Sequence, residues 1–326
     1  MKIKEGEVIG LFSPSVPITA FCPKRTQRGI EYLENKGFKV LKGNLTGKSD
    51  FYRSGSILER SNELNDLIKN KEVRCMMSAI GGMNSNSLLP YIDYQAFKDD
   101  PKIVTGYSDV TALLLAIYAK TGITTLYGPA LVASFGEFPP YVDETFDYFK
   151  NLVIDNIKLP YKIDNPKFWT DEFIDWESQE HPKSRNKVKL ITLSAGKATG
   201  RLIGGNLNTI SGIWGTEYMP EIKKGDILLI EDSLLDIATV ERSFSHFKLA
   251  GVFDKVAGII LGKHELFDNK GTGREHYDVL MEVIGNTNIP ILAEYNCSHV
   301  HPMITLPIGG IVTLDADNQT LTIEKI

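Results

Sequence analysis

The stretch KIVTGYSDVTALLLAIYA, residues 102–119, joins two apolar runs through a turn that carries one serine. The pattern predicts a buried strand, a sharp turn and an apolar helix. Ser108 stands at the turn, where a hydroxyl projects from a strand end beside the free N–H groups of a helix N-terminus, as a nucleophilic serine requires. Ser108 and Asp109 would also suit a helix cap and a first-turn acid. The G-x-S-x-G elbow is incomplete, because Val110 stands where the second glycine would be.

Short β-rich runs alternate with helical patterns around this stretch. The predicted strands are residues 7–12, 38–41, 74–80 and 123–127, and the predicted helices are residues 24–36, 57–69 and about 87–97. This alternation implies right-handed crossovers and a parallel sheet with helices on both faces, so residues 1–155 are predicted to form a doubly wound α/β domain. Ligands of such sheets bind at the carboxyl ends of the strands. The loops 13–15, 81–87 and 107–109 are therefore expected to share a cleft.

The alternation is lost in residues 156–189, a polar stretch that contains Trp169 and Trp176. A loop of this length inside a compact protein is either a linker or a functional flap. Exposed tryptophans favour a flap, because large rings are common binding anchors. The alternative is that both rings cover a domain junction.

Residues 190–326 are predicted to form a mixed α/β domain that is rich in β-structure. The predicted elements are strands at residues 200–203, 226–230, 258–261 and 289–295, helices at 239–250 and 275–284, and a glycine-rich turn at Gly204-Gly205. The tail alternates like a β-hairpin with its turn near residues 315–318.

The composition narrows the class of protein. With a formal charge of −5, the protein has no overall positive field that would attract the negatively charged backbone of a nucleic acid. The N-terminal apolar run is too short for a signal peptide, and the run at residues 110–119 is too short to span a bilayer. We therefore expect a cytoplasmic protein with no membrane or nucleic-acid partner. Its three cysteines form no C-x-x-C pair, so free thiols are expected.

A nucleophilic serine needs a base, and the base needs a third group that holds its tautomer. His264, His299 and His301 all follow predicted strands, whereas Glu231 ends a strongly apolar one. Glu231 would be partly buried and would need a partner, although a helix N-cap pair with Asp232 or a solvated strand end fits it equally well. In an extended segment His299 and His301 would share one face, as two zinc ligands would. No third ligand has a telling spacing, so no metal is predicted.

Several motifs together resemble the LD-carboxypeptidase family of serine peptidases. They are Ile80-Gly81-Gly82, the run LPYIDY at residues 89–94, Gly106-Tyr107-Ser108-Asp109, Ile230-Glu231-Asp232-Ser233, and His299 followed by TLPIG at residues 305–309. These landmarks occur in the family's order and span nearly the whole chain.

The resemblance implies a catalytic triad of Ser108 as nucleophile, Glu231 as orienting acid and His299 as base. It selects His299 over His301, because the family's histidine stands six residues before the Thr-Leu-Pro step. It also implies an oxyanion hole formed by the backbone N–H groups of Gly82 and Asp109. One departure is Ser298, where the family usually has glycine.

The loop 81–86 and the flap sequence WTDEFIDW, residues 169–176, are more similar to the microcin C immunity branch than to the murein peptidases of the family. That branch hydrolyses the amide between an aminoacyl group and a modified adenylate. The resemblance implies that Trp176, or failing that Trp169, stacks on a nucleobase. Asn208 and Asn84 are the expected polar contacts to a small peptide or aminoacyl-nucleotide substrate. The resemblance also implies that the enzyme needs no cofactor and forms a homodimer. Two alternative functions stay open, a murein tetrapeptide carboxypeptidase and a non-catalytic ligand-binding protein.

Overall fold

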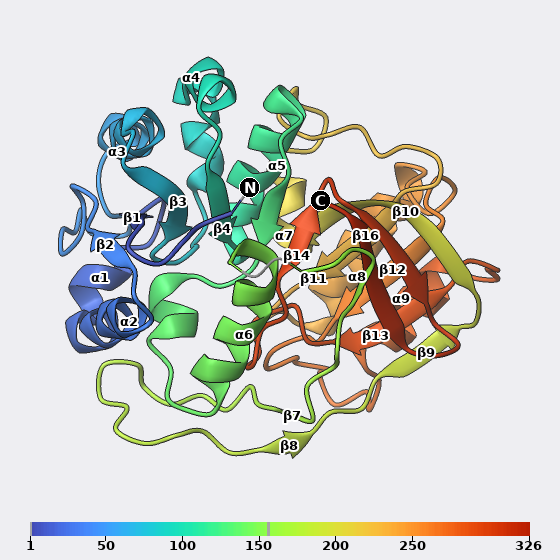
Figure 1. The fold of residues 1–326 in the computed structure, drawn as a ribbon. Helices are drawn as coiled ribbons and strands as arrows, with labels where there is room; N and C mark the ends of the chain where they lie inside the picture. Colours follow the sequence, from blue (N-terminus) through green and yellow to red (C-terminus); the bar gives the residue numbers. More distant parts are fainter. Residues whose placement is uncertain (1, 155–156) are drawn as a thin grey trace.

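The computed structural model describes residues 2–154 and 157–326, which form two large sheets side by side (Figure 1). A two-stranded ribbon lies in the flap below them. The boundary predicted between residues 155 and 156 lies outside the described residues.

The first sheet has the strand order β14-β5-β4-β3-β1-β2. Its parallel members are β1 (Val8–Phe12), β2 (Lys39–Leu41), β3 (Val73–Ser78), β4 (Ile103–Gly106) and β5 (Thr125–Tyr127). This parallel pairing confirms the predicted doubly wound α/β fold. The edge strand β14 (Leu306–Ile308) comes from the far end of the chain and pairs antiparallel with β5.

Helices cover both faces of this sheet (Figure 1). One face carries α3 (Ile57–Lys69), α4 (Tyr94–Asp99) and α5 (Thr111–Thr121), and the other carries α1 (Ile18–Phe21), α2 (Pro23–Asn35), the π-helical turn η3 (Leu131–Phe135) and α6 (Tyr141–Val153). The bounds predicted for α3 are confirmed at both ends. A capping box of Ser56 and Glu59 fixes its start, because each side chain satisfies a free N–H of the first turn.

The single helix predicted at residues 87–97 is wrong. The chain forms a 3₁₀ helix, η1 (Ser85–Tyr91), and then α4, whose N-cap Asp93 accepts a hydrogen bond from the Ala96 N–H. Pro90 has no N–H to continue a helix, so the helical pattern is divided there.

The second sheet has the order β6-β16-β15-β10-β11-β12-β13-β9 and is mixed, as predicted. Its strands are β6 (Tyr161–Lys162), β9 (Ile191–Ser194), β10 (Lys197–Asn206), β11 (Ile227–Glu231), β12 (Gly258–Gly262), β13 (Ile291–Tyr295), β15 (Ile311–Asp315) and β16 (Thr320–Lys325). Its helices are α7 (Leu207–Ser211), α8 (Ile237–Leu249) and α9 (His276–Ile284). The pairing of β15 with β16 confirms the predicted hairpin.

The turn predicted at Gly204-Gly205 is wrong, because both glycines lie inside β10. A Cβ atom at Gly204 would lie 1.8 Å from the Leu229 carbonyl oxygen, and one at Gly205 would lie 2.7 Å from the Thr111 side chain. The glycines therefore allow β10 to approach both its neighbour β11 and helix α5 closely.

Helix α5 lies between the two sheets and contacts β4, β5 and β10. Its residues from Thr111 to Ile117 are all buried, as expected for a helix that is apolar on every side. The helix that follows Ser108 therefore joins the cores of the two halves.

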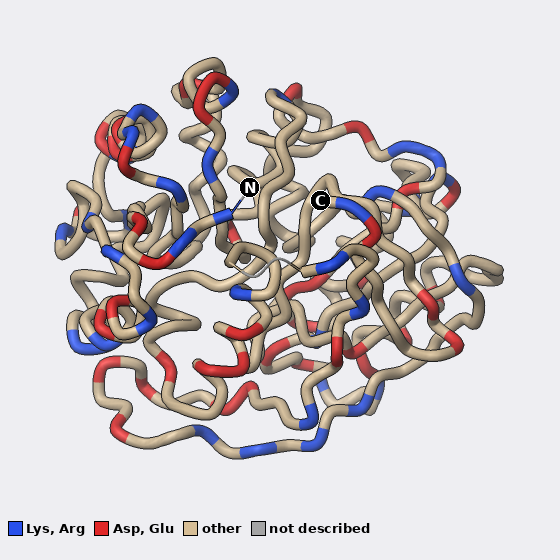
Figure 2. Tube along the Cα trace, viewed as in Figure 1, with Lys and Arg blue, Asp and Glu red and all other residues tan. Residues whose placement is uncertain are grey.

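The flap, residues 157–189, contains β6 and a small ribbon of β7 (Phe168–Trp169) and β8 (Asn186–Lys187) along the bottom of Figure 1. Both flap tryptophans are half-buried rather than exposed. Basic and acidic residues are both spread over the trace, and along the flap an acidic stretch is followed by a basic one (Figure 2). In residues 2–154 and 157–326, helices long and apolar enough to cross a membrane are absent.

Candidate active site

A cavity of about 450 Å³ lies between the carboxyl ends of the strands in both sheets and the flap. Its walls come from residues 80–83, 107–108, 208–209, 232–235 and 265–266, from Val16, Asn206, His299 and His301, and from Glu172, Phe173, Trp176 and Lys183 of the flap. Two of the three loops expected to share a cleft line this cavity. The third, residues 13–15, lies behind it, where Ser15 Oγ accepts a hydrogen bond from the Met83 N–H at 3.0 Å.

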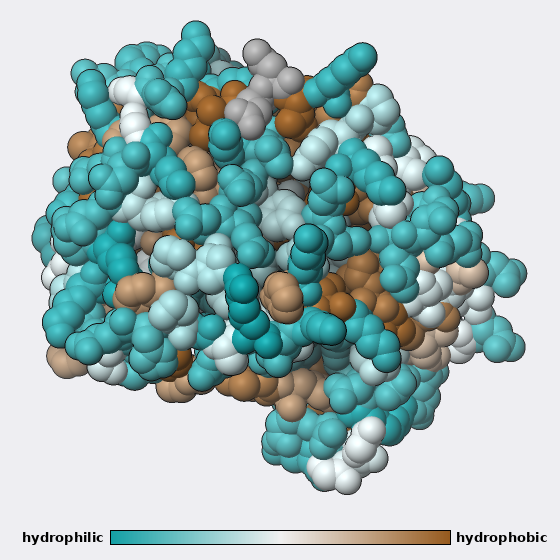
Figure 3. All heavy atoms as spheres, turned by 60° about the horizontal axis from the view of Figure 1, so that its bottom comes forward, coloured by the Kyte–Doolittle hydropathy of each residue, from teal (hydrophilic) through white to brown (hydrophobic). Residues whose placement is uncertain are grey.

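The flap, which lies along the bottom of Figure 1, forms part of the cavity wall. Figure 3 turns this side toward the viewer and shows a largely hydrophilic surface broken by brown apolar patches. Four exposed apolar side chains belong to the cavity lining, namely Met83, Phe173, Leu234 and Leu266. The entrance is therefore suited to a ligand with an apolar part.

Ser108 occupies the turn between β4 and α5 with a φ angle of +60°. Residues other than glycine rarely adopt this conformation, which costs on the order of 1–3 kcal/mol and is concentrated at functional sites. The Ser108 N–H donates to the Tyr127 hydroxyl at 3.3 Å. The strained turn leaves the side chain at the cavity wall, as the nucleophile hypothesis requires.

His299, which is partly buried and lines the same cavity as Ser108, pairs with Glu231. The Nδ1 atom of His299 lies 2.8 Å from Glu231 Oε2, and the Glu231 side chain is fully buried. The second oxygen, Oε1, accepts hydrogen bonds from the Tyr127 hydroxyl at 2.5 Å and from Asn206 Nδ2 at 3.0 Å. The Tyr107 ring contacts the imidazole edge-on, with 5.0 Å between ring centroids. Tyr127 and Asn206 thus hold the Glu231 carboxylate in place, and the carboxylate in turn orients the His299 imidazole.

Ser108 and His299 line the same cavity, but in the part of the chain that the structure describes their side chains share no hydrogen bond. Catalytic hydrogen bonds are often long in ligand-free enzymes and shorten when substrate binds. Because Nδ1 faces Glu231, Nε2 is the imidazole atom available to the serine.

The charge of His299 depends on opposing effects. Burial lowers the pKa of the imidazole, but Glu231, through its charge and hydrogen bond, and the carboxylates of Glu265 and Asp232 raise it to about 9. A base must be neutral before it can accept a proton, so the active form of His299 becomes more abundant as the pH rises.

We expect kcat/KM of the free enzyme to increase about tenfold per pH unit below an apparent pKa near 9, because only neutral His299 can act as base. A pH–rate profile between pH 6 and 10 measures this. A profile that is flat or falls over this range would contradict His299 as the base.

Gly82 and Asp109 meet at the same strand ends. Gly82 has a φ angle of +146°, and a Cβ atom there would lie 2.2 Å from Ser15 Oγ, so the loop requires glycine. Within the described residues Gly82 makes no hydrogen bond. The Asp109 N–H belongs to the first turn of η2 (Ser108–Val110), where helical N–H groups have no intrahelical acceptor. Both N–H groups are suited to bind an anionic oxygen.

The Asp109 carboxylate has a function that the sequence did not indicate. Its Oδ2 atom accepts hydrogen bonds from the N–H groups of Asn84 and Ser85 and from the Ser85 hydroxyl at 2.6–3.0 Å. It therefore fixes the loop that carries Gly82 against the turn that carries Ser108.

The expected substrate contacts divide into two groups. Trp176 and Asn208 line the cavity, whereas Asn84 and Trp169 do not. The Asn84 side chain is bound by Arg60 at 2.6 Å and by Ser15 at 3.0 Å. The Trp169 ring lies against the Lys263 ammonium, 4.3 Å from the ring centroid. These contacts direct Asn84 and Trp169 away from the cavity.

The hypothesis that His299 and His301 lie in an extended segment and share one face is wrong. Residues 296–300 form bends, and the two rings face different carboxylates. His299 is bound to Glu231, whereas His301 Nε2 lies 3.8 Å from Glu137. Within residues 2–154 and 157–326, His, Cys, Asp and Glu form no group of three or more that could hold a metal ion.

Sequence reasoning missed several cavity or supporting residues, chiefly Tyr127, Asn206, Lys183 and Glu265. Tyr127 is the last residue of β5, so the strand pattern could have predicted that it lies at the same sheet edge as Ser108. Asn206 ends β10 next to Glu231 in the parallel register, which requires knowledge of the strand order.

A strained serine and a histidine paired with a buried glutamate thus line or border one cavity, an arrangement that also occurs in serine hydrolases. The chain matches the LD-carboxypeptidase N-terminal domain over residues 9–128 and the LD-carboxypeptidase C-terminal domain over residues 199–314. The protein therefore belongs to the LD-carboxypeptidase family, a family of serine-hydrolase-type carboxypeptidases.

The similar proteins span nearly the whole chain. A putative carboxypeptidase of Vibrio cholerae is 59% identical over 98% of this chain and 95% of its own length. The microcin C7 self-immunity protein MccF of Escherichia coli is 53% identical over 98% of this chain and 94% of its length. A solved structure of MccF in complex with aspartyl sulfamoyl adenosine has a TM-score of 0.98 at 52% identity, covering 100% of this chain and 98% of that one. A probable murein peptide carboxypeptidase of Bacillus subtilis is 26% identical over 99% of this chain and 93% of its own.

Proposed function

We propose that the protein is a serine amidase that hydrolyses the bond between an aminoacyl or peptidyl group and a nucleotide analogue. One arrangement carries the proposal: Ser108, the His299–Glu231 pair and the Trp176 ring line or border a single cavity. The likeness to MccF, which has been solved with aspartyl sulfamoyl adenosine, supports the substrate class.

In the proposed mechanism, Ser108 Oγ attacks the amide carbonyl while His299 Nε2 accepts the hydroxyl proton. The N–H groups of Gly82 and Asp109 bind the developing oxyanion, and Glu231 stabilises the imidazolium. His299 then gives the proton to the departing nitrogen as the C–N bond breaks. A water molecule, deprotonated by His299, then attacks the acyl carbon, the bond between this carbon and Ser108 Oγ breaks, and His299 returns the proton to Oγ as the acyl group leaves as a carboxylic acid.

Substrate binding is assigned to Trp176 and Asn208. An aromatic face is a base-stacking platform that tolerates different bases. Trp176 offers such a face in the cavity wall, and Asn208 is an exposed amide in the same wall. Asn84 and Trp169 are left out of this proposal because of their contacts outside the cavity.

A second candidate is release of the terminal residue from a murein tetrapeptide, which the relative in Bacillus subtilis favours. The Gly81-Gly82-Met83-Asn84 loop and the flap tryptophan favour the nucleotide substrate instead. Both candidates use the same serine chemistry, so only the leaving group separates them.

Comparison of two substrates tests the proposal. We expect kcat/KM for an aminoacyl sulfamoyl adenosine to exceed that for a murein tetrapeptide by about tenfold or more, because the stack on Trp176 is available only to the nucleoside. Liquid chromatography of the released products measures both rates. A preference for the tetrapeptide would assign the murein function, and no hydrolysis of either would contradict the proposal.

We further propose that the protein acts in the cytoplasm and that it assembles as a homodimer. Residues 1–155 supply the nucleophile, residues 156–189 the flap with the stacking ring, and residues 190–326 the acid and base. Sedimentation velocity measures the assembly directly.

A further inference from the structure

The proposed base-stacking ring is itself stacked on a buried arginine. The guanidinium carbon of Arg25 lies 4.7 Å from the centroid of the Trp176 ring. Arg25 comes from α2 and is fully buried, and it is not part of the cavity lining, whereas Trp176 is. The guanidinium therefore covers one face of the indole and leaves the other face for the cavity.

Arg25 is rigidly fixed from the side of the first sheet. Its Nε donates to the Val132 carbonyl at 2.8 Å, and its Nη2 donates to the Ala133 carbonyl and to Glu137 Oε2, both at 3.0 Å. Glu137 is also fully buried. A planar guanidinium held by these acceptors has a defined plane, so a ring stacked on it inherits a defined orientation.

One flap residue joins this arrangement. Gln179 is 3% exposed, and its side-chain oxygen accepts a hydrogen bond from Arg25 Nη1. Its Nε2 donates to Glu137 Oε1 at 2.6 Å and to the His181 carbonyl at 3.0 Å. Gln179 thus satisfies both buried charges at once, three residues after Trp176.

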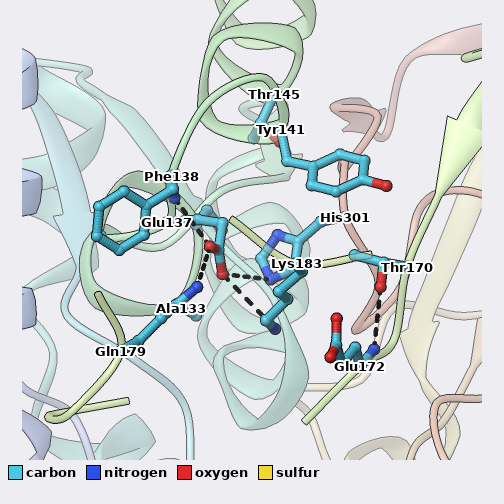
Figure 4. Close-up of polar contacts among 12 residues, drawn as sticks. Ala133, Glu137, Phe138, Tyr141, Thr145, Thr170, Glu172, Gln179, Lys183 and His301 are labelled. Carbon is cyan, nitrogen blue, oxygen red and sulfur yellow. Dashed lines mark hydrogen bonds and ion pairs between the residues drawn. The ribbon is translucent and has the colours of Figure 1, made fainter. Parts of the chain in front are cut away.

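Figure 4 shows the surroundings of Glu137, with Gln179 and Lys183 of the flap and His301 of the second half directed at its carboxylate. A second attachment lies at the other end of the flap segment, where Thr170 and His301 exchange backbone hydrogen bonds of 2.9 and 3.0 Å. The segment 171–178, which carries Glu172, Phe173 and Trp176, is therefore held at both ends.

We propose that Gln179 and Arg25 are positioning residues for substrate binding. Gln179 fastens the flap to Arg25 and Glu137, and Arg25 sets the plane in which Trp176 meets a nucleobase. The proposal rests on the assignment of Trp176 as the stacking ring under the proposed function. Neither positioning residue touches the substrate or the reacting atoms.

A double-mutant cycle tests this coupling. Gln179→Leu keeps the bulk of the side chain but removes its hydrogen bonds, and we expect it to raise KM for an aminoacyl sulfamoyl adenosine about tenfold while kcat stays within about twofold. Trp176→Ala is expected to have a similar effect, and the double variant to be no worse than Trp176→Ala alone. Gln27→Leu, on an exposed position of α2, is the matched control and is expected to match the parent.

Additive effects of the two substitutions would overturn the proposal, because Gln179 would then act independently of Trp176. Arg25→Lys, which keeps the charge but loses the planar fork, is expected to give the same KM defect. A parental KM in folded Arg25→Lys protein would remove Arg25 from the positioning role.

A spectroscopic measurement separates this proposal from the proposed function. In a Trp169→Phe, Trp214→Phe background, Trp176 is the only tryptophan, so the tryptophan fluorescence reports on this ring alone. We expect Gln179→Leu to increase the quenching of Trp176 by acrylamide and to weaken its response to adenosine monophosphate. Unchanged quenching would refute the docking role. Increased quenching in a protein that hydrolyses neither substrate would leave Gln179 as the flap attachment and refute the enzymatic assignment.

Discussion

Replacing Ser108 with alanine is expected to lower kcat for an aminoacyl sulfamoyl adenosine by about 10⁴-fold or more, since removal of a nucleophile leaves only binding and the oxyanion donors. The fold should be retained, because Ser108 is half-buried and its hydroxyl makes no hydrogen bond among the described residues. We expect the free energy of unfolding to change by less than about 1 kcal/mol. Single-turnover kinetics and denaturant unfolding measure the two effects.

Ser243→Ala, on α8, provides the control for loss of a serine hydroxyl away from the cavity. A fluorophosphonate should label the parent and the control but leave the Ser108→Ala variant unlabelled, because an unactivated serine does not react. Parental turnover in Ser108→Ala would show that another group is the nucleophile.

Glu231→Gln has the second large expected effect, a loss of about 10⁴-fold in kcat/KM. Tyr127 and Asn206 both donate to Glu231 Oε1, so the amide oxygen of a glutamine is favoured at that site. The amide NH₂ would then face His299 Nδ1 and force the proton onto Nε2. An imidazole in that tautomer cannot accept the Ser108 proton.

The same substitution also removes the main charge that raises the pKa of His299. The remaining activity of Glu231→Gln is therefore expected to be independent of pH above neutrality, whereas the parent rises toward pH 9. Glu282→Gln, exposed on α9, is the matched control. A Glu231→Gln variant with parental activity and a parental pH profile would contradict the orienting role.

Much of the fold could be predicted because the apolar runs have clear limits. Ser56 and Glu59 mark the start of α3, and the alternating tail marks the β15–β16 hairpin. The predictions of helix and turn positions that were wrong involve residue types that occur in two different structural settings. Pro90 ends one helical turn inside an otherwise helical pattern, and Gly204 marks a close strand contact rather than a turn.

The location of the site also followed from strand ends, since Ser108, Glu231 and His299 all stand at or after them. The family resemblance was needed to distinguish His299 from His301. The supporting contacts could not be predicted, because Tyr127 and Asn206 reach Glu231 from different sheets. The Arg25–Gln179 contact spans 154 sequence positions and depends on how the flap folds back.

The antiparallel strand β14 links the closure of the first sheet to the position of His299 in the folded chain. It closes the β5 edge of the sheet that carries Ser108, and it begins seven positions after His299 on the same segment. An unpaired β5 would be an open sheet edge prone to pair with other chains. The docking that protects this edge also delivers the histidine to the serine. Disruption of β14 is therefore expected both to expose the β5 edge and to displace His299.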